Sequence, residues 1–229
     1  MKYLLFSPNM KLADLISANY KLLLVFDRFN IHLGFGDKSV KDICSQYNIP
    51  VSLFLIVCNV YTFEDYLPED DELQSFKVDS LIDYLNHSHR YYVEECLPAI
   101  SQKLDVVSRS QDTKPGTVLQ KFYKVYEDEV INHFIYEEEV VFPYIRQVSG
   151  GKSSDNYNIE QFEKNHSDID EKLNDLKNII IKYLHVNSSS KELNALLFDL
   201  FELGDDFKKH TLIENKILVP LAAQFEKQA

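Results

Sequence analysis

The sequence is poor in cysteine. Its three cysteines, Cys44, Cys58 and Cys96, are an odd number and form no CxxC pair, so a disulfide framework is not expected. This usage is typical of a reducing compartment, and we predict a cytoplasmic protein. No apolar run approaches the roughly 20 residues that a bilayer-spanning helix needs, and the N-terminal residues show no small-residue cleavage site of a signal peptide. We therefore expect no membrane partner.

Basic residues are also scarce. The chain of 229 residues has 24 Lys and Arg against 36 Asp and Glu, a formal net charge of −12. Binding to phosphate needs clustered Lys and Arg, so this balance argues against a nucleic-acid partner. The alternating pattern of a β-strand is also missing throughout, and the hydrophobic residues instead recur every three or four positions. The sequence therefore predicts an all-α protein.

The N-terminal part reads as a small helical domain over residues 1–63. Ser39 is a plausible N-cap for one of its helices, and Pro50 opens a stretch that is apolar nearly all round and should be buried. Residues 64–75 are acidic and contain Pro68, which is typical of a linker.

Residues 76–229 contain four amphipathic segments of about 30 residues each, or about 45 Å if fully helical. Turn-rich breaks separate them at 113–116, 149–156 and 185–190. Because short connections between long helices make neighbours antiparallel, we predict an up-down-up-down four-helix bundle. In the second segment we expect Val118, Val125 and Glu129 on the stripe that faces the core.

One short pattern occurs twice in this region. Residues 133–143 read HFIYEEEVVFP and residues 210–220 read HTLIENKILVP, so each His is followed by a Glu four residues later and a Pro ten residues later. Positions i and i+4 of a helix share one face, so His133 and Glu137 can direct two donor atoms to one point, as can His210 and Glu214.

Two further histidines complete the set. His89 lies 44 residues before His133, and His166 lies 44 residues before His210. This offset is expected of a duplicated helix pair, and it places one histidine on each helix of the bundle. It also selects His89 over His87, which lies on another face and should be exposed.

The six polar residues fall on stripes that should face the core. Any single one could be a core side chain bonded to a neighbour. That explanation would have to hold for four histidines at matched spacing and for two Glu residues on the same faces. A buried imidazole or carboxylate without a partner costs several kcal/mol. A pair of transition-metal ions supplies a common partner. We predict these ligands: His89, His133, Glu137, His166, His210 and Glu214.

Several other acidic residues and one further histidine lie near the predicted ligands in the sequence. Glu129, one turn before His133, could orient a ligand imidazole. Glu138 and Glu139 should point away from the His133 face into solvent, and His185 should end the third helix without binding metal. Imidazole suits zinc, copper, iron and nickel, and bridging carboxylates favour a dinuclear site with open positions for small ligands.

The order of these elements resembles the hemerythrin-like domain of the iron-sulfur-cluster repair proteins, the "repair of iron centres" family. The residues that carry the resemblance are His89, the HFIYEEEVVFP segment, EKNHSDIDEKL around His166, and HTLIENKILVP. The first 60 residues also resemble the small N-terminal domain of that family. The resemblance implies a four-helix bundle with two iron ions in an oxo-bridged centre, and the family's ligand positions fall on the same six residues.

The resemblance also implies a function in the repair of iron-sulfur clusters after oxidative or nitrosative damage. Nitric oxide or dioxygen would be the small ligands, and damaged iron-sulfur proteins would be the protein partners. A homodimer is one alternative for the assembly of the chain. Two alternatives remain: a binding or sensing module for dioxygen or nitric oxide, and an oxidoreductase that reduces nitric oxide or peroxide. This sequence departs from the family in lacking an adjacent Cys pair near its N-terminus, and from the respiratory oxygen carriers in having Asp170 one turn after His166.

Overall fold

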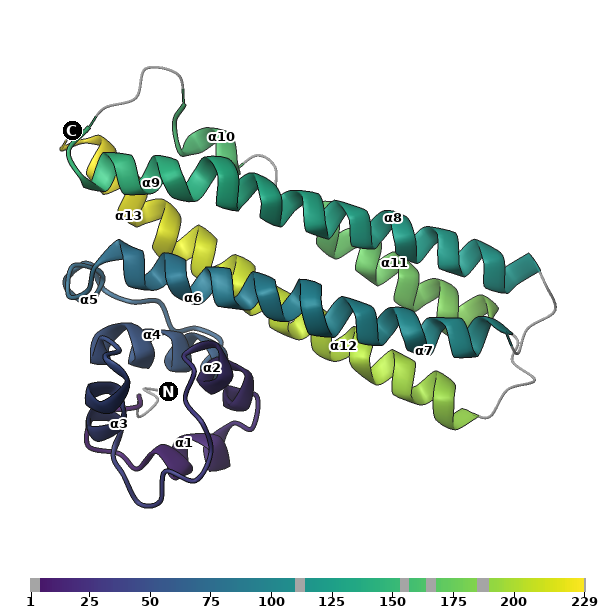
Figure 1. The fold of residues 1–229 in the computed structure, drawn as a ribbon, viewed down its shortest axis with the longest axis horizontal. Coiled ribbons are helices and arrows are strands. Elements are labelled where there is room, and N and C mark those ends of the chain that lie inside the picture. The colour runs from purple at the N-terminus through teal and green to yellow at the C-terminus, as the bar shows by residue number, and fades with distance from the viewer. Residues whose placement is uncertain (1–4, 110–113, 153–156, 164–167, 185–189, 229) are drawn as a thin grey trace. The chain divides into compact units, whose positions relative to one another are not determined.

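The computed structural model is helical throughout the part of the chain that it describes, residues 5–109, 114–152, 157–163, 168–184 and 190–228 (Figure 1). Within these ranges the only extended pairing is one isolated bridge between Lys11 and Ser39. The prediction of an all-α protein is therefore confirmed. No helix among the described residues is long and apolar enough to cross a membrane.

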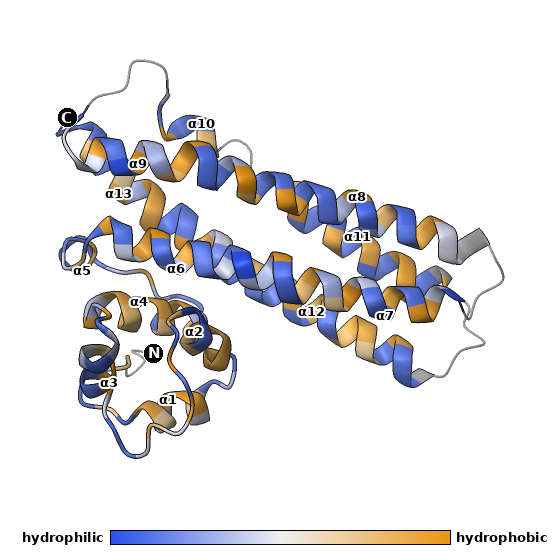
Figure 2. Cartoon of the chain, viewed as in Figure 1, coloured by the Kyte–Doolittle hydropathy of each residue, from blue (hydrophilic) through white to orange (hydrophobic). Residues whose placement is uncertain are grey.

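Five short helices form the N-terminal part: α1 (Leu12–Ala18), α2 (Leu22–Arg28), α3 (Val40–Tyr47), α4 (Val51–Thr62) and α5 (Asp70–Leu73). The predicted N-cap is confirmed, because the Ser39 hydroxyl accepts the Asp42 N–H and the Asp42 carboxylate accepts the Ser39 N–H in a capping box. Helix α4 is mostly hydrophobic (Figure 2), and eight of its twelve residues are buried, as its composition predicts.

The described remainder of the chain includes three long helices that each contain a π-helical turn. The first consists of α6 (Val78–Tyr91), η1 (Tyr92–Cys96) and α7 (Leu97–Arg109), and the second of α8 (Lys114–Tyr136), η2 (Glu137–Val141) and α9 (Phe142–Ser149). The last consists of α12 (Ser190–Ile213), η3 (Glu214–Leu218) and α13 (Val219–Glu226), and between the second and the last lie α10 (Glu160–Glu163) and α11 (Asp168–Tyr183).

The chain divides into two compact units. The first comprises Met1–Ser88, Ile145–Asp155 and Lys209–Ala229, and the second comprises His89–Tyr144 and Asn156–Lys208. The domain boundaries expected from the sequence stay a prediction. Residues 64–75, expected to be a linker, contain α5, and the side chains of Tyr66 and Leu73 are buried.

In the first unit the N-terminal helices contact the start of α6 and the end of α12. The Phe29 and Tyr84 rings pack with their centroids 4.7 Å apart, and the Lys209 ammonium donates to the Val60 carbonyl at 2.8 Å. Phe29 after α2 and Val60 within α4 therefore connect the N-terminal helices to α6 and α12 by ring packing and a hydrogen bond.

The second unit is a helical bundle. Helix α7 packs against α8, and α8 packs against α11. Consecutive helices joined by short connections, α7 with α8 and α11 with α12, run in opposite directions (Figure 1), as the short connections predict. Its core has aliphatic and aromatic residues from α7, α8, α11 and α12, among them Leu104, Tyr123, Leu176 and Leu200.

The prediction of which residues of the second long helix face the core is wrong by one position. Val118 and Val125 are 62% and 56% exposed, whereas the neighbouring Leu119 and Tyr126 are buried. A tyrosine can be buried at low cost when its hydroxyl has a hydrogen-bond partner. The Tyr123 hydroxyl has one, because it donates to the Leu97 carbonyl at 2.7 Å. The valines therefore lie on the flank of the helix.

Candidate metal centre

His133 and Glu137 form the first predicted pair, at the junction of α8 and η2. His133 Nε2 lies 3.1 Å from Glu137 Oε1, and the Glu137 side chain is fully buried. The contact follows from the i, i+4 spacing, which places the two side chains on one helix face.

His89 brings a second imidazole to the same carboxylate. Its Nε2 lies 3.1 Å from Glu137 Oε2, so each oxygen of Glu137 faces a different histidine. The His89 ring is held between Phe134, with centroids 4.1 Å apart, and Phe142, at 5.6 Å, both nearly parallel to it. These contacts orient the imidazole and keep water from its faces.

The other nitrogen of His89 contacts Glu138, whose Oε1 lies 2.9 Å from Nδ1. In the tautomer that leaves Nε2 available to a metal, Nδ1–H donates to this carboxylate. Glu138 is solvent-exposed as expected, with 45% of its side chain accessible, but its carboxylate also contacts His89, which the sequence did not predict. Glu129, expected to orient a ligand, instead accepts from the Lys172 ammonium.

His210 and Glu214 form the second predicted pair, in the other compact unit. His210 Nε2 lies 2.9 Å from Glu214 Oε1, and both side chains are buried. Glu214 opens η3 as Glu137 opens η2, so the repeated sequence pattern produces a repeated local structure.

Two of the three π turns, η2 and η3, coincide with this pattern, and all three share one further feature. The N–H groups of Leu97, Phe142 and Val219 bond to carbonyls five residues earlier, at Tyr92, Glu137 and Glu214. The next residue is proline each time, Pro98, Pro143 and Pro220, and proline cannot donate to the following turn. Single π turns within α-helices are frequent at functional sites. Sequence reasoning missed them, although a proline within each amphipathic segment was an available signal.

The donor set fits iron. An unprotonated imidazole nitrogen and a carboxylate oxygen both present lone pairs, so burying them face to face is costly without a cation. When two donor atoms bind one ion at right angles and at about 2.1 Å, they lie about 3 Å from each other. The distances between His Nε2 and Glu Oε atoms in this structure are similar. The side chains of His89, Glu137, His210 and Glu214 are each buried, and each offers an atom that could bind a metal ion.

Five of the six predicted ligands lie within the described residues and are found in these His–Glu contacts. His166 lies outside the described residues, as does His185. A nearby residue that sequence reasoning did not select is Tyr157, whose hydroxyl lies 3.0 Å from that of Tyr136. Burial, and to a lesser extent the neighbouring Tyr136 and Glu137, raises the pKa of Tyr157.

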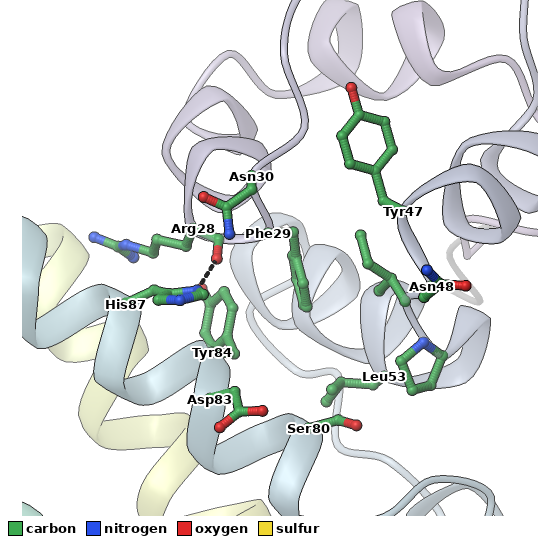
Figure 3. A pocket seen from close by; sticks show the side chains of 12 residues that line it. Arg28, Phe29, Asn30, Tyr47, Asn48, Leu53, Ser80, Asp83, Tyr84 and His87 are labelled. Carbon is green, nitrogen blue, oxygen red and sulfur yellow. Dashed lines mark hydrogen bonds between the residues drawn. The ribbon is translucent and has the colours of Figure 1, made fainter.

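His87 is half-buried, not exposed as expected. Its Nδ1 lies 2.7 Å from the Arg28 main-chain oxygen, and Figure 3 shows the ring turned toward that carbonyl beside Tyr84. It lines a partly open cavity of about 190 Å³ in the first unit, whose lining contains none of the predicted ligands.

Known proteins are similar to this chain over most of its length. The hemerythrin HHE cation-binding domain matches residues 80–222, more than half of the chain and a range that contains all six predicted ligands. The iron-sulfur cluster repair protein YtfE of Cronobacter sakazakii is 26% identical over 162 residues, which are 70% of this chain and 72% of that protein. The protein of the same name from Escherichia coli O81 is 25% identical over 157 residues, 68% of this chain and 70% of that protein.

Proposed function

Since the chain belongs to the hemerythrin HHE cation-binding domain family, we propose that it holds a pair of iron ions and acts in the repair of damaged iron-sulfur clusters. The ligands are those that the sequence predicts: His89, His133, Glu137, His166, His210 and Glu214. Bound iron supplies one-electron redox chemistry and open positions for nitric oxide or dioxygen.

The observation that carries the di-iron proposal is the position of Glu137. Its two oxygens face two different histidines, each at 3.1 Å. A carboxylate that served one ion would need only one of these directions. Glu137, together with His89 and His133, would therefore be able to hold more than one ion.

The surrounding residues have their own functions in this site. Glu138 holds His89 by its outer nitrogen, which fixes the tautomer and the ring direction. Phe134 and Phe142 cover the two faces of that ring, and an apolar enclosure of this kind limits the access of water.

Repair is supported by the names of the relatives, which are iron-sulfur cluster repair proteins. Damaged iron-sulfur proteins are then the clients. They either receive iron from this protein or have nitric oxide removed by it near the cluster. The proposed location is the cytoplasm. Two outcomes would instead favour the alternatives. Catalytic turnover of nitric oxide or peroxide with an added reductant indicates a reductase, and tight reversible binding without repair indicates a sensor.

The test uses an iron-sulfur dehydratase inactivated by nitric oxide under anaerobic conditions. The iron-loaded protein should restore dehydratase activity, and the Glu137→Gln variant, which keeps the side-chain shape but lacks the charge, should not. The Glu139→Gln variant is the matched control, because Glu139 is an exposed neighbour. Equal recovery with and without the wild-type protein would contradict a repair function.

A further inference from the structure

A buried tyrosine and a buried carboxylate form a hydrogen bond within the second unit. The Tyr92 hydroxyl donates to Asp206 Oδ2 at 2.6 Å, and the two residues are 0% and 5% exposed. Burying a phenol and an aspartate together costs free energy that apolar side chains in the same place would not incur. A pair of apolar residues would hold η1 and α12 together at lower cost, so the pair calls for a chemical explanation.

Tyr92 is also connected to a proposed metal ligand through stacked rings. The Tyr92 and Phe134 rings are 5.6 Å apart with an interplanar angle of 18°, and the Phe134 and His89 rings are 4.1 Å apart with an angle of 16°. The three rings thus form one column that ends at the imidazole of His89. Such a column offers a short path for an electron.

The position of Tyr92 in its helix strengthens the connection. It opens η1 and lies six residues before Pro98, just as Glu137 opens η2 before Pro143 and Glu214 opens η3 before Pro220. The first helix therefore has a phenol where the other two have carboxylates.

We propose that Tyr92 is a redox-active residue that donates one electron toward the metal centre while its proton passes to Asp206. The inference rests on the proposed iron site. It assigns Tyr92 and Asp206 a function in peroxide reduction when the irons can supply only one electron.

Hydrogen peroxide would take up two electrons, and two protons from solvent, and leave as two waters. Iron held at the proposed site would supply one of these electrons, and Tyr92 gives the other. The phenolic O–H bond breaks, its proton binds Asp206 Oδ2, and a neutral tyrosyl radical remains, hydrogen-bonded to the new carboxylic acid.

The bundle contains a matched control. Tyr123 is as deeply buried as Tyr92, but its hydroxyl donates to the main-chain carbonyl of Leu97. A carbonyl oxygen is far too weak a base to take the phenolic proton. Tyr123 should therefore stay reduced under conditions that oxidise Tyr92.

The experiment treats iron-loaded protein, reduced to hold one ferrous ion per two irons, with hydrogen peroxide and freezes it for electron paramagnetic resonance. The wild type should show a tyrosyl signal whose hyperfine splitting narrows when the protein contains ring-deuterated tyrosine. Tyr92→Phe keeps the ring column and should lose the signal. Asp206→Asn keeps a hydrogen-bond acceptor but not the base and should lower the radical yield, while Tyr123→Phe should match the wild type.

Iron content and the visible spectrum, measured on the same samples, separate the two proposals. Variants that hold wild-type iron but lose the radical support the function of Tyr92. A wild-type protein that holds two irons and gives no radical, or a signal that persists in Tyr92→Phe, overturns this inference and leaves the iron site intact. A wild-type protein that binds no iron overturns both.

Discussion

Glu138 Oε1 lies 2.9 Å from His89 Nδ1, on the opposite side of the ring from the contact between Nε2 and Glu137. The imidazole is thus held at both nitrogens by consecutive residues of η2. One of these carboxylates is fully buried, whereas the other is 45% exposed.

We expect Glu138→Ala to weaken iron binding without abolishing it. Loss of a residue that orients a metal-binding histidine typically lowers metal affinity about 10–100-fold. Glu139→Ala removes the same charge from the adjacent exposed position and should have little effect. Competition with a chelator of known affinity measures both, and equal iron affinities for the two variants would contradict the orienting function of Glu138.

His87 and His89 should give separable effects. His89→Ala removes a proposed ligand, so iron retention should fall and the visible bands should shift. His87→Ala should keep the iron but lose the hydrogen bond to the Arg28 carbonyl, which lowers the free energy of unfolding by about 1 kcal/mol. Iron analysis and thermal denaturation of both variants provide the test. Iron loss in the His87 variant alone would exclude the assignment of His89.

The thiol of Cys44 should make stability depend on pH in the alkaline range. Burial raises the pKa of Cys44 from 9.0 to about 12. Because the folded state holds this proton more tightly, the contribution to stability is complete below pH 9 and is lost as the pH rises toward 12.

Comparison with Cys44→Ala isolates this effect. The difference in unfolding free energy between wild type and variant, from denaturant titrations at several pH values, should shift against the wild type between pH 9 and 12. A difference that is constant over this range would contradict the burial of an un-ionised thiol. Cys58 is also buried, with its pKa raised by burial and by Cys44, so neither thiol is a ready nucleophile in the folded protein.

Helical periodicity predicted much of the site because it depends only on which residues share a face. The i, i+4 contacts of His133 with Glu137, and of His210 with Glu214, are preserved since each Glu is only the first residue of its π turn. The same reasoning failed for the stripe of Val118 and Val125, where two adjacent faces are both apolar and only the packing of the tyrosines decides between them.

The π turns coincide with a contact that the sequence did not predict. Glu138 is the second residue of η2, where the helix contains an extra residue per turn. Regular α-helical geometry places it about 100° from Glu137, on a solvated flank. In the structure its side chain is 45% exposed and also reaches the outer nitrogen of His89. Neither residue composition nor periodicity carries a signal for that contact, although Pro143 indicates that the helix is interrupted nearby.

The central claim is that this chain holds two irons through histidines and bridging carboxylates, and the most direct test is metal content per chain together with the visible absorption spectrum. Protein loaded with ferrous iron under anaerobic conditions and then exposed to air should contain close to two irons and show the charge-transfer bands of a coupled di-ferric pair. Glu137→Gln should lose these bands. A protein that retains a single ion, or that binds zinc in preference and shows no such bands, would contradict the account.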